Sequence, residues 1–176
     1  MARVSSMPFM IEVKVLLPGD WQLWRELRLQ ALAEAPHAFG ATLAYWQGDG
    51  DREQRWRARL AIPSSRNLIA FLGGKPVGMV SGVPAINDTD AVELISLWVK
   101  PEARGRGVGG RLVDDVEQWA AGLNLKTMQL SVMPSNEAAI RLYRRHGLRD
   151  TGEKGDPTPD GTSREIIMAK PISSAV

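Results

Sequence analysis

The pattern of apolar and polar positions in the first third of the chain predicts one strand followed by two helices. Apolar and polar residues alternate over 9–17, a period of two that is typical of a half-buried strand. Asp20 is suited to cap a helix whose apolar residues recur at helical spacing to about Glu34, before Pro36. Residues 51–60 predict a second helix, charged over most of its surface.

The middle of the chain predicts a hairpin and then a strand-helix-strand unit. Residues 67–83 contain two apolar stretches joined by a Gly-Gly turn, and 91–99 is apolar enough for a strand buried on both faces. A glycine-rich segment leads into a helix over 108–121, followed by a strand over 126–133. The strands on either side of this helix should be parallel, with a right-handed crossover.

The last third predicts a helix, a loop and a final strand. Residues 134–147 form a helix with a polar cap and a terminal glycine, the loop covers 152–162, and the strand covers 163–171. We expect the first few residues and the segment 153–162 to be flexible. The 176 residues are predicted to form a single domain, 1–176. Its class is α/β (α+β), a mixed sheet of about seven strands flanked by helices.

Composition narrows the choice of partners. The net charge of +2 lacks the dense basic surface of a nucleic-acid binder, so no nucleic-acid partner is expected. Without cysteine the chain offers no thiolate metal site and no cysteine nucleophile, and its two histidines are too few and too far apart to suggest a metal site. Charged residues interrupt the apolar start, so we expect a cytoplasmic protein with no membrane partner.

The segment 101–112, PEARGRGVGGRL, is a candidate phosphate site. Its glycines lie between a predicted strand and a predicted helix, where backbone N–H groups and the positive end of the helix dipole favour an anion. Arg104, Arg106 and Arg111 add charged donors. The alternative is a flexible turn with solvated arginines.

The G-x-G-x-x-G spacing of this segment also occurs in dinucleotide-binding proteins. Here five residues separate the strand from Gly105, and residues 124–133 contain no acid to meet a ribose hydroxyl. No G-K-[ST] follows the glycines, which excludes a Walker loop. A nicotinamide or flavin cofactor is therefore not predicted.

The segment Arg104-x-x-Gly107-x-Gly109, followed downstream by NEAAIRLYRRHGL, resembles the acetyl-CoA-binding region of the GNAT superfamily, the Gcn5-related N-acetyltransferases. The likeness is strong over 91–149, although Leu148 stands where the family more often has phenylalanine. It implies a GNAT-like fold, acetyl-CoA as co-substrate and no metal. It also implies a cofactor site made by Leu97, Trp98, Val99, Arg104, Gly105, Arg106, Gly107, Val108, Gly109, Gly110, Asn136 and Tyr143.

Two side chains are candidates for the chemistry of acetyl transfer. Glu93 lies in an apolar strand, where a desolvated carboxylate could accept a proton from the amine, directly or through water; an ordinary strand acid is an equal alternative. Tyr143 could protonate the departing thiolate, and the alternative is a core tyrosine. Asn136 is also a candidate helix cap, a role compatible with cofactor contact.

The remaining polar and aromatic candidates carry less weight. His146 is expected to cap a helix C-terminus, and the arginines of that helix to form a solvated face. Phe39, Tyr45 and Trp46 either border the acceptor cleft or pack two helices together.

The sequence thus predicts an N-acetyltransferase that acylates a primary amine by direct attack in a ternary complex. The alternatives are a protein or peptide amine as acceptor and a non-catalytic acyl-CoA-binding regulatory module. A homodimer is left open.

Overall fold

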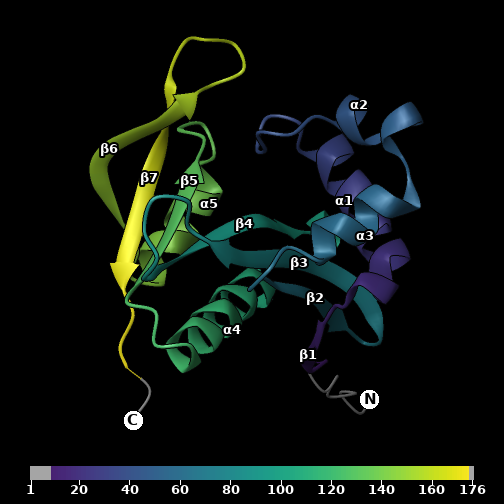
Figure 1. Ribbon diagram of the computed structural model, residues 1–176, viewed down its shortest axis with the longest axis horizontal. Helices are drawn as coiled ribbons and strands as arrows, with labels where there is room; N and C mark the ends of the chain where they lie inside the picture. The colour runs from purple at the N-terminus through teal and green to yellow at the C-terminus, as the bar shows by residue number, and fades with distance from the viewer. Residues whose placement is uncertain (1–8, 175–176) are drawn as a thin grey trace, which may run out of the picture.

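The computed structural model describes residues 9–174, which are built on a single mixed sheet of seven strands in the order β1-β2-β3-β4-β5-β7-β6 (Figure 1). The strands are β1 (Ile11–Val15), β2 (Arg66–Leu72), β3 (Lys75–Pro84), β4 (Ala91–Val99), β5 (Thr127–Val132), β6 (Arg149–Pro157) and β7 (Arg164–Pro171). The helices are α1 (Trp21–Glu34), α2 (Leu43–Trp46), α3 (Glu53–Leu60), α4 (Val108–Gly122) and α5 (Glu137–Arg145). No helix within this part of the chain has the length and apolarity needed to cross a membrane.

The sheet changes direction at one junction. Strands β1 to β4 pair antiparallel in chain order, whereas β4 and β5 pair in parallel, as predicted for the strand-helix-strand unit. The parallel ladder contains only the pairs from Ala91↔Thr127 to Glu93↔Gln129. Beyond these pairs the two strands diverge, and this divergence creates the space for a site.

Helices cover the two faces of the sheet unequally. On one face α4 and α5 pack over a large apolar core, which includes Val92, Leu112, Val116, Met128, Ile140 and Leu148. On the other face α1 and α3 pack over β2, β3 and β4, around Trp24, Leu27, Trp56, Ile69 and Met79. In Figure 1, α1 to α3 lie on one side of the β4–β5 junction, and β6 and β7 lie on the other.

The first helix begins as predicted, but its capping differs. Asp20 occupies the residue before α1, yet its side chain makes no hydrogen bond to the helix. Its carboxylate instead accepts hydrogen bonds of 2.9 Å from the backbone of Leu17 and from Nζ of Lys14, which lowers its pKa. Asp20 therefore ties the end of β1 to the start of the helix.

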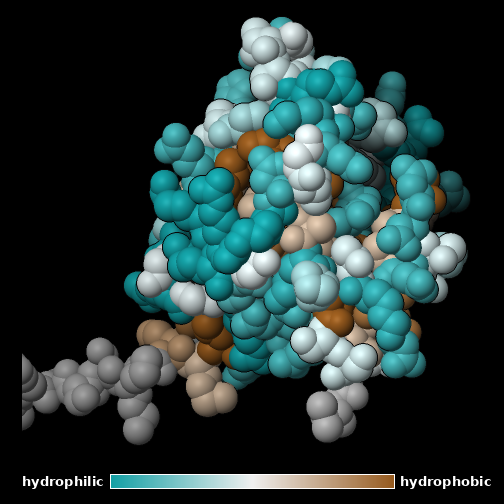
Figure 2. Space-filling model, turned by 90° about the vertical axis from the view of Figure 1, so that its left-hand side faces the viewer, coloured by the Kyte–Doolittle hydropathy of each residue, from teal (hydrophilic) through white to brown (hydrophobic). Residues whose placement is uncertain are grey.

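The predicted loop over 152–162 is wrong for its first half. Strand β6 runs through to Pro157, and the chain turns only at 158–163 before β7. The strand is almost fully exposed and pairs irregularly with β7, so it lacks the apolar alternation that marks a half-buried strand. Figure 2 shows the mainly hydrophilic surface on this side of the molecule. The other segment predicted to be flexible, the extreme N-terminus, lies outside the described residues.

Candidate functional site

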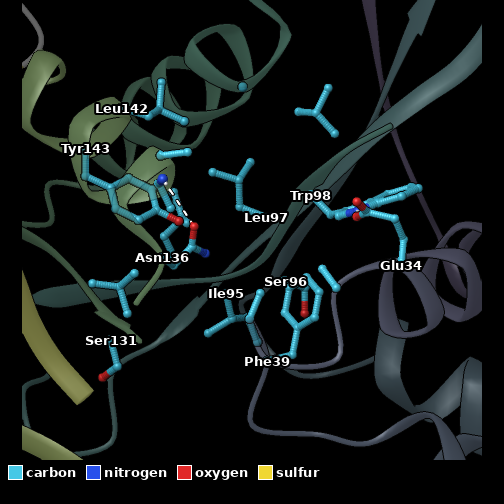
Figure 3. Close-up of a pocket in the computed structure, with 18 of the residues that line it drawn as sticks. Glu34, Phe39, Ile95, Ser96, Leu97, Trp98, Ser131, Asn136, Leu142 and Tyr143 are labelled. Atoms are coloured by element: carbon cyan, nitrogen blue, oxygen red, sulfur yellow. Dashed lines mark hydrogen bonds between the residues drawn. The ribbon is translucent and has the colours of Figure 1, made fainter. Parts of the chain in front are cut away.

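A cleft of about 870 Å³ opens where β4 and β5 diverge. It is lined by residues from α1, β4, the start of α4, β5, α5 and the β6–β7 hairpin. Figure 3 shows Tyr143 and Asn136 on one side, Trp98 and Glu34 on the other, and Leu97 between them. The cleft thus brings together segments that are far apart in the sequence.

The divergence coincides with a break in the regularity of β4. Ser96 has φ +58°, a left-handed conformation that is rare for a residue with a side chain, and the β3–β4 register shifts between Met79 and Ser81. The ladder to β5 ends at Glu93, so the later β4 backbone groups on that side have no strand partner. The predicted cofactor residues Leu97, Trp98 and Val99 lie in this segment and line the cleft.

The glycine turn places the N-terminus of α4 at the same cleft. Gly107 precedes the helix with φ +85°, a conformation that favours glycine. The first helical hydrogen bond runs from the backbone N–H of Arg111 to the carbonyl of Gly107, at 3.0 Å. The three N–H groups before Arg111 have no helical acceptor, which makes the turn a suitable anion site.

Most of the predicted turn residues line this cleft, with one exception. Arg104, Gly105, Gly107, Val108, Gly109 and Gly110 all border it. Arg106 borders a smaller cavity instead, together with Phe9 and Lys100.

The side chains of two arginines around the turn donate hydrogen bonds to other groups of the protein. Arg104 donates to Glu34 at 2.8 Å and to the carbonyl of Val99 at 3.0 Å. Arg111 donates to Asp115 at 3.1 Å and to the carbonyl of Ile11 at 3.3 Å. These two guanidinium groups therefore use some of their donors within the protein, whereas the backbone N–H groups at the start of α4 have no helical acceptor.

Two of the glycines allow α4 and α5 to approach closely. A Cβ atom on Gly109 would lie 3.0 Å from Leu142, and one on Gly110 would lie 2.7 Å from Nε2 of His146. His146 follows α5 at its C-cap, as predicted, and its Nδ1 lies 2.8 Å from a carboxylate oxygen of Asp114 on α4. The sequence showed these glycines only as part of a phosphate site, whereas the structure gives them a packing role as well.

Tyr143 and Asn136 both border the cleft from the α5 side. Tyr143 is 7% exposed, and burial raises the pKa of its phenol. The side chain of Asn136 accepts a hydrogen bond of 3.3 Å from the backbone of Ala139, so its predicted capping role is confirmed (Figure 3).

Glu93 borders the same cleft in a cluster of carboxylates. Burial raises the pKa of Glu93, and the negative charge of Asp156 raises it further. Glu165 also borders the cleft, and its pKa is raised by burial and by Asp156. Within the described part of the chain no group of such residues is arranged to hold a metal ion. A carboxylate with a raised pKa in a cleft is suited to accept a proton.

Sequence reasoning missed several residues of the cleft. Asp156 falls within the segment predicted to be a loop, where no site residue was expected. Arg28 and Arg59 are polar residues on predicted helices, at positions that the sequence pattern assigned to the solvent-facing side. Of the three aromatic candidates, Phe39 and Trp46 border the cleft, whereas Tyr45 is 62% exposed and packs under the guanidinium of Arg55.

The sequence is similar to a family model and to several known proteins. The profile described as "Acetyltransferase (GNAT) family" matches residues 24–148. The IAA acetyltransferase of Azospirillum brasilense is 34% identical over 114 residues, which cover 64% of this chain and 72% of that protein. The [ribosomal protein bS18]-alanine N-acetyltransferase of Escherichia coli K12 is 34% identical over 86 residues, covering 48% of this chain and 58% of that protein. The chain thus spans less than two thirds of the second relative.

Solved structures share the fold at lower identity. A GNAT-family acetyltransferase from Streptococcus pneumoniae superimposes with a TM-score of 0.77 and 20% identity, covering 93% of this chain and all of that one. The PaiA N-acetyltransferase from Thermoplasma acidophilum, in complex with coenzyme A, gives a TM-score of 0.70 at 18% identity, covering 92% and 99% of the two chains. The seven-stranded mixed sheet with flanking helices is the fold of these proteins.

Proposed function

The chain belongs to the acetyltransferase (GNAT) family, and we propose that it transfers an acetyl group from acetyl-CoA to the primary amine of a small molecule, by direct attack in a ternary complex. One observation carries this proposal. The β4–β5 ladder ends at Glu93↔Gln129, and the N-terminus of α4 borders the cleft that opens beyond it. Backbone N–H groups without helical acceptors and strand backbone without a β5 partner therefore meet beside two candidate proton-transfer groups.

The residues of the cleft fit the parts of acetyl-CoA. The backbone N–H groups at the start of α4 would bind the pyrophosphate, because they lack helical acceptors and lie at the positive end of the helix dipole. The backbone of Leu97 and the N–H of Val99, which have no β5 partner, would hydrogen-bond the pantetheine arm, with Asn136 on the opposite side. When bound, acetyl-CoA supplies the thioester that carries the acetyl group.

The proton transfers are assigned to two side chains. Glu93, directly or through water, would take the proton that the amine nitrogen loses as it bonds to the acetyl carbon. As the carbon–sulfur bond breaks, Tyr143 would donate its phenolic proton to the departing thiolate. The sequence contains no cysteine, so an acyl-cysteine enzyme cannot form, which supports direct transfer.

The test is release of coenzyme A from acetyl-CoA in the presence of a panel of small amines and peptides with free N-termini. We expect release that depends on a small amine, with the acetylated amine detected by mass spectrometry in equal amount. Release of coenzyme A only in the presence of peptides would indicate that the acceptor is a protein or peptide amine and not a small molecule. Tight binding of acetyl-CoA without release for any acceptor would indicate a regulatory module instead.

A further inference from the structure

The cleft contains a second set of polar side chains besides the carboxylates, made by arginines of α1 and α3. Arg28, on α1, borders the cleft, is only 8% exposed, and its Nη1 is shielded from solvent with no hydrogen-bond partner among residues 9–174. Its guanidinium lies 4.6 Å from the centre of the Phe39 ring. A buried cation is costly unless an anion or several hydrogen bonds compensate it.

A second arginine reaches the same region from α3. Arg59 borders the cleft, and its guanidinium donates at 3.1 Å to Asn67 and to Ser81, two neutral groups paired across β2 and β3. A longer contact of 3.5 Å joins it to Ser96, at the irregular point of β4. Arg59 also lies over the Trp24 ring, at 5.1 Å from its centre.

Neither arginine has an acidic partner in the described part of the chain. The ion pairs found there use other arginines, namely Arg25, Arg57, Arg104, Arg111 and Arg141. Burial lowers the pKa of Arg28 and of Arg59 to about 10, and the charge of Arg59 contributes to the shift at Arg28. A buried and a partly buried positive charge thus lie near each other without a counter-ion among residues 9–174.

We propose that the acetyl acceptor is an amine that also carries a carboxylate, and that Arg28 and Arg59 bind this carboxylate. The proposal rests on the acetyltransferase function given above and names its substrate class. A guanidinium binds a carboxylate through parallel hydrogen bonds, and the neutral partners of Arg59 leave its positive charge uncompensated. The acceptor would supply the missing negative charge.

The charges elsewhere in the cleft favour a zwitterion over a phosphate ester. Glu93, Asp156 and Glu165 border the cleft from β4, β6 and β7, and would repel a dianion while attracting an ammonium group. Ser96, which contacts Arg59, lies three positions after Glu93 on the same strand, β4. The arginines and Glu93 thus line one cleft, so a single acceptor would present its carboxylate to the arginines and its amine to Glu93.

The test compares matched pairs of acceptors that differ only in the carboxylate: phenylalanine against phenethylamine, methionine against 3-(methylthio)propylamine, and lysine against 1,5-diaminopentane. We expect kcat/KM, measured by release of coenzyme A, to favour the carboxylate-bearing member of at least one pair by about tenfold or more. Arg28→Met should abolish that preference, because it should lower kcat/KM for the carboxylate-bearing member far more than for the decarboxylated amine. Arg28→Lys should retain part of the preference, because lysine keeps the positive charge but lacks the planar guanidinium that donates two parallel hydrogen bonds.

Arg57→Met is the control, because Arg57 lies on α3 like Arg59 but pairs with Glu53 and does not border the cleft. It should keep the preference. Arg28→Met removes an unpaired buried charge, so we expect it to fold, with a melting temperature no lower than that of the wild type. Equal kcat/KM for the two members of every pair, or a preference that survives in both Arg28→Met and Arg59→Met, would overturn the proposal.

A binding measurement separates this proposal from the proposed function. Hydrocinnamate has the carboxylate and the ring of phenylalanine but no amine, so it cannot be acetylated. Calorimetry should show that it binds the wild type and binds Arg28→Met about tenfold or more weakly. If no amine releases coenzyme A, the proposed function fails, while this measurement still decides whether the arginines bind a carboxylate; equal affinity for both proteins would refute that.

Discussion

An oxygen of Glu34 lies 2.8 Å from Nη2 of Arg104, joining the end of α1 to the turn that precedes α4. The same oxygen accepts a hydrogen bond of 2.9 Å from the indole N–H of Trp98. These two hydrogen bonds, the one from Arg104 first, lower the pKa of Glu34. One carboxylate therefore connects the helix that bears Arg28 to the segment assigned to the cofactor.

Removing this carboxylate should loosen the turn. We expect Glu34→Ala to lower the free energy of unfolding by about 1 kcal/mol, since the ion pair is partly exposed, and to raise KM for acetyl-CoA. Chemical denaturation and initial rates measure the two effects. Glu26→Ala is the control, because Glu26 is an exposed residue of α1. An unchanged KM in Glu34→Ala would contradict the link to the turn.

The contact between Gly110 and His146 leads to a second prediction. A Cβ on Gly110 would lie 2.7 Å from Nε2 of a ring that Asp114 holds in place. Gly110→Ala should therefore separate α4 from α5, destabilise the fold by about 1–3 kcal/mol, and raise the Kd of acetyl-CoA.

Two further variants serve as controls for this prediction. The double variant Gly110→Ala/His146→Ala should recover much of the lost stability, because the clash needs both side chains. Gly122→Ala, at the end of the same helix, has open space around the new Cβ and should be neutral or slightly stabilising. If the double variant were as unstable as the sum of the single variants, the clash would not be the cause.

Glu93→Gln tests the proposed base. The variant should lower kcat/KM by about 10²-fold or more at neutral pH, with little change in the Kd of acetyl-CoA. In the wild type, kcat/KM should rise with pH through the pKa of Glu93, which burial and Asp156 place above the ordinary glutamate value. A rate at neutral pH equal to that of the wild type would exclude the role.

The same raised pKa predicts a pH-dependent effect on stability. The folded state holds the Glu93 proton to a higher pH than the unfolded state, so this residue makes the fold less stable as pH rises above 4.5, the ordinary glutamate value. Glu93→Gln should therefore melt at a higher temperature than the wild type at pH 7, and the difference should shrink toward pH 4. A difference that does not depend on pH would show that desolvation of the charge is not its cause.

Tyr143→Phe tests the proposed acid. Burial keeps the phenol protonated through neutral pH, so the variant removes a proton donor without changing a charge. We expect kcat to fall about 10²-fold while the Kd of acetyl-CoA stays near the wild-type value. Tyr45→Phe, at the other tyrosine of the chain, should leave both constants unchanged because that side chain is exposed and does not border the cleft. Equal losses in the two variants would remove Tyr143 from the mechanism.

The sequence predicted most of the fold because most elements carry a local signal. The apolar run of β4 and the helical spacing of α4 were sufficient to place both elements and to predict the parallel pairing with β5. Strand β6 was missed because an exposed edge strand buries no face and therefore shows no alternation.

The site was predicted in part for a similar reason. The glycine turn, Glu93 and Tyr143 were found because a glycine cluster, an acid in an apolar strand and a paired motif are visible locally. Arg28 and Arg59 were not found, because the burial of a helical arginine depends on what packs over it. Here that is Phe39 from the loop after α1, and the sheet surface formed by β2 and β3.

The short β4–β5 ladder divides the sheet into two halves that meet over three residue pairs. The amide groups of β4 that face the gap beyond Glu93 have no strand partner, so their hydrogens should exchange with solvent much faster than those of β3 beside them. Any molecule that hydrogen-bonds within the gap would slow this exchange residue by residue. Amide hydrogen exchange measured along Ile95–Val99 therefore shows which part of the gap a bound molecule fills. The measurement requires neither turnover nor an identified acceptor.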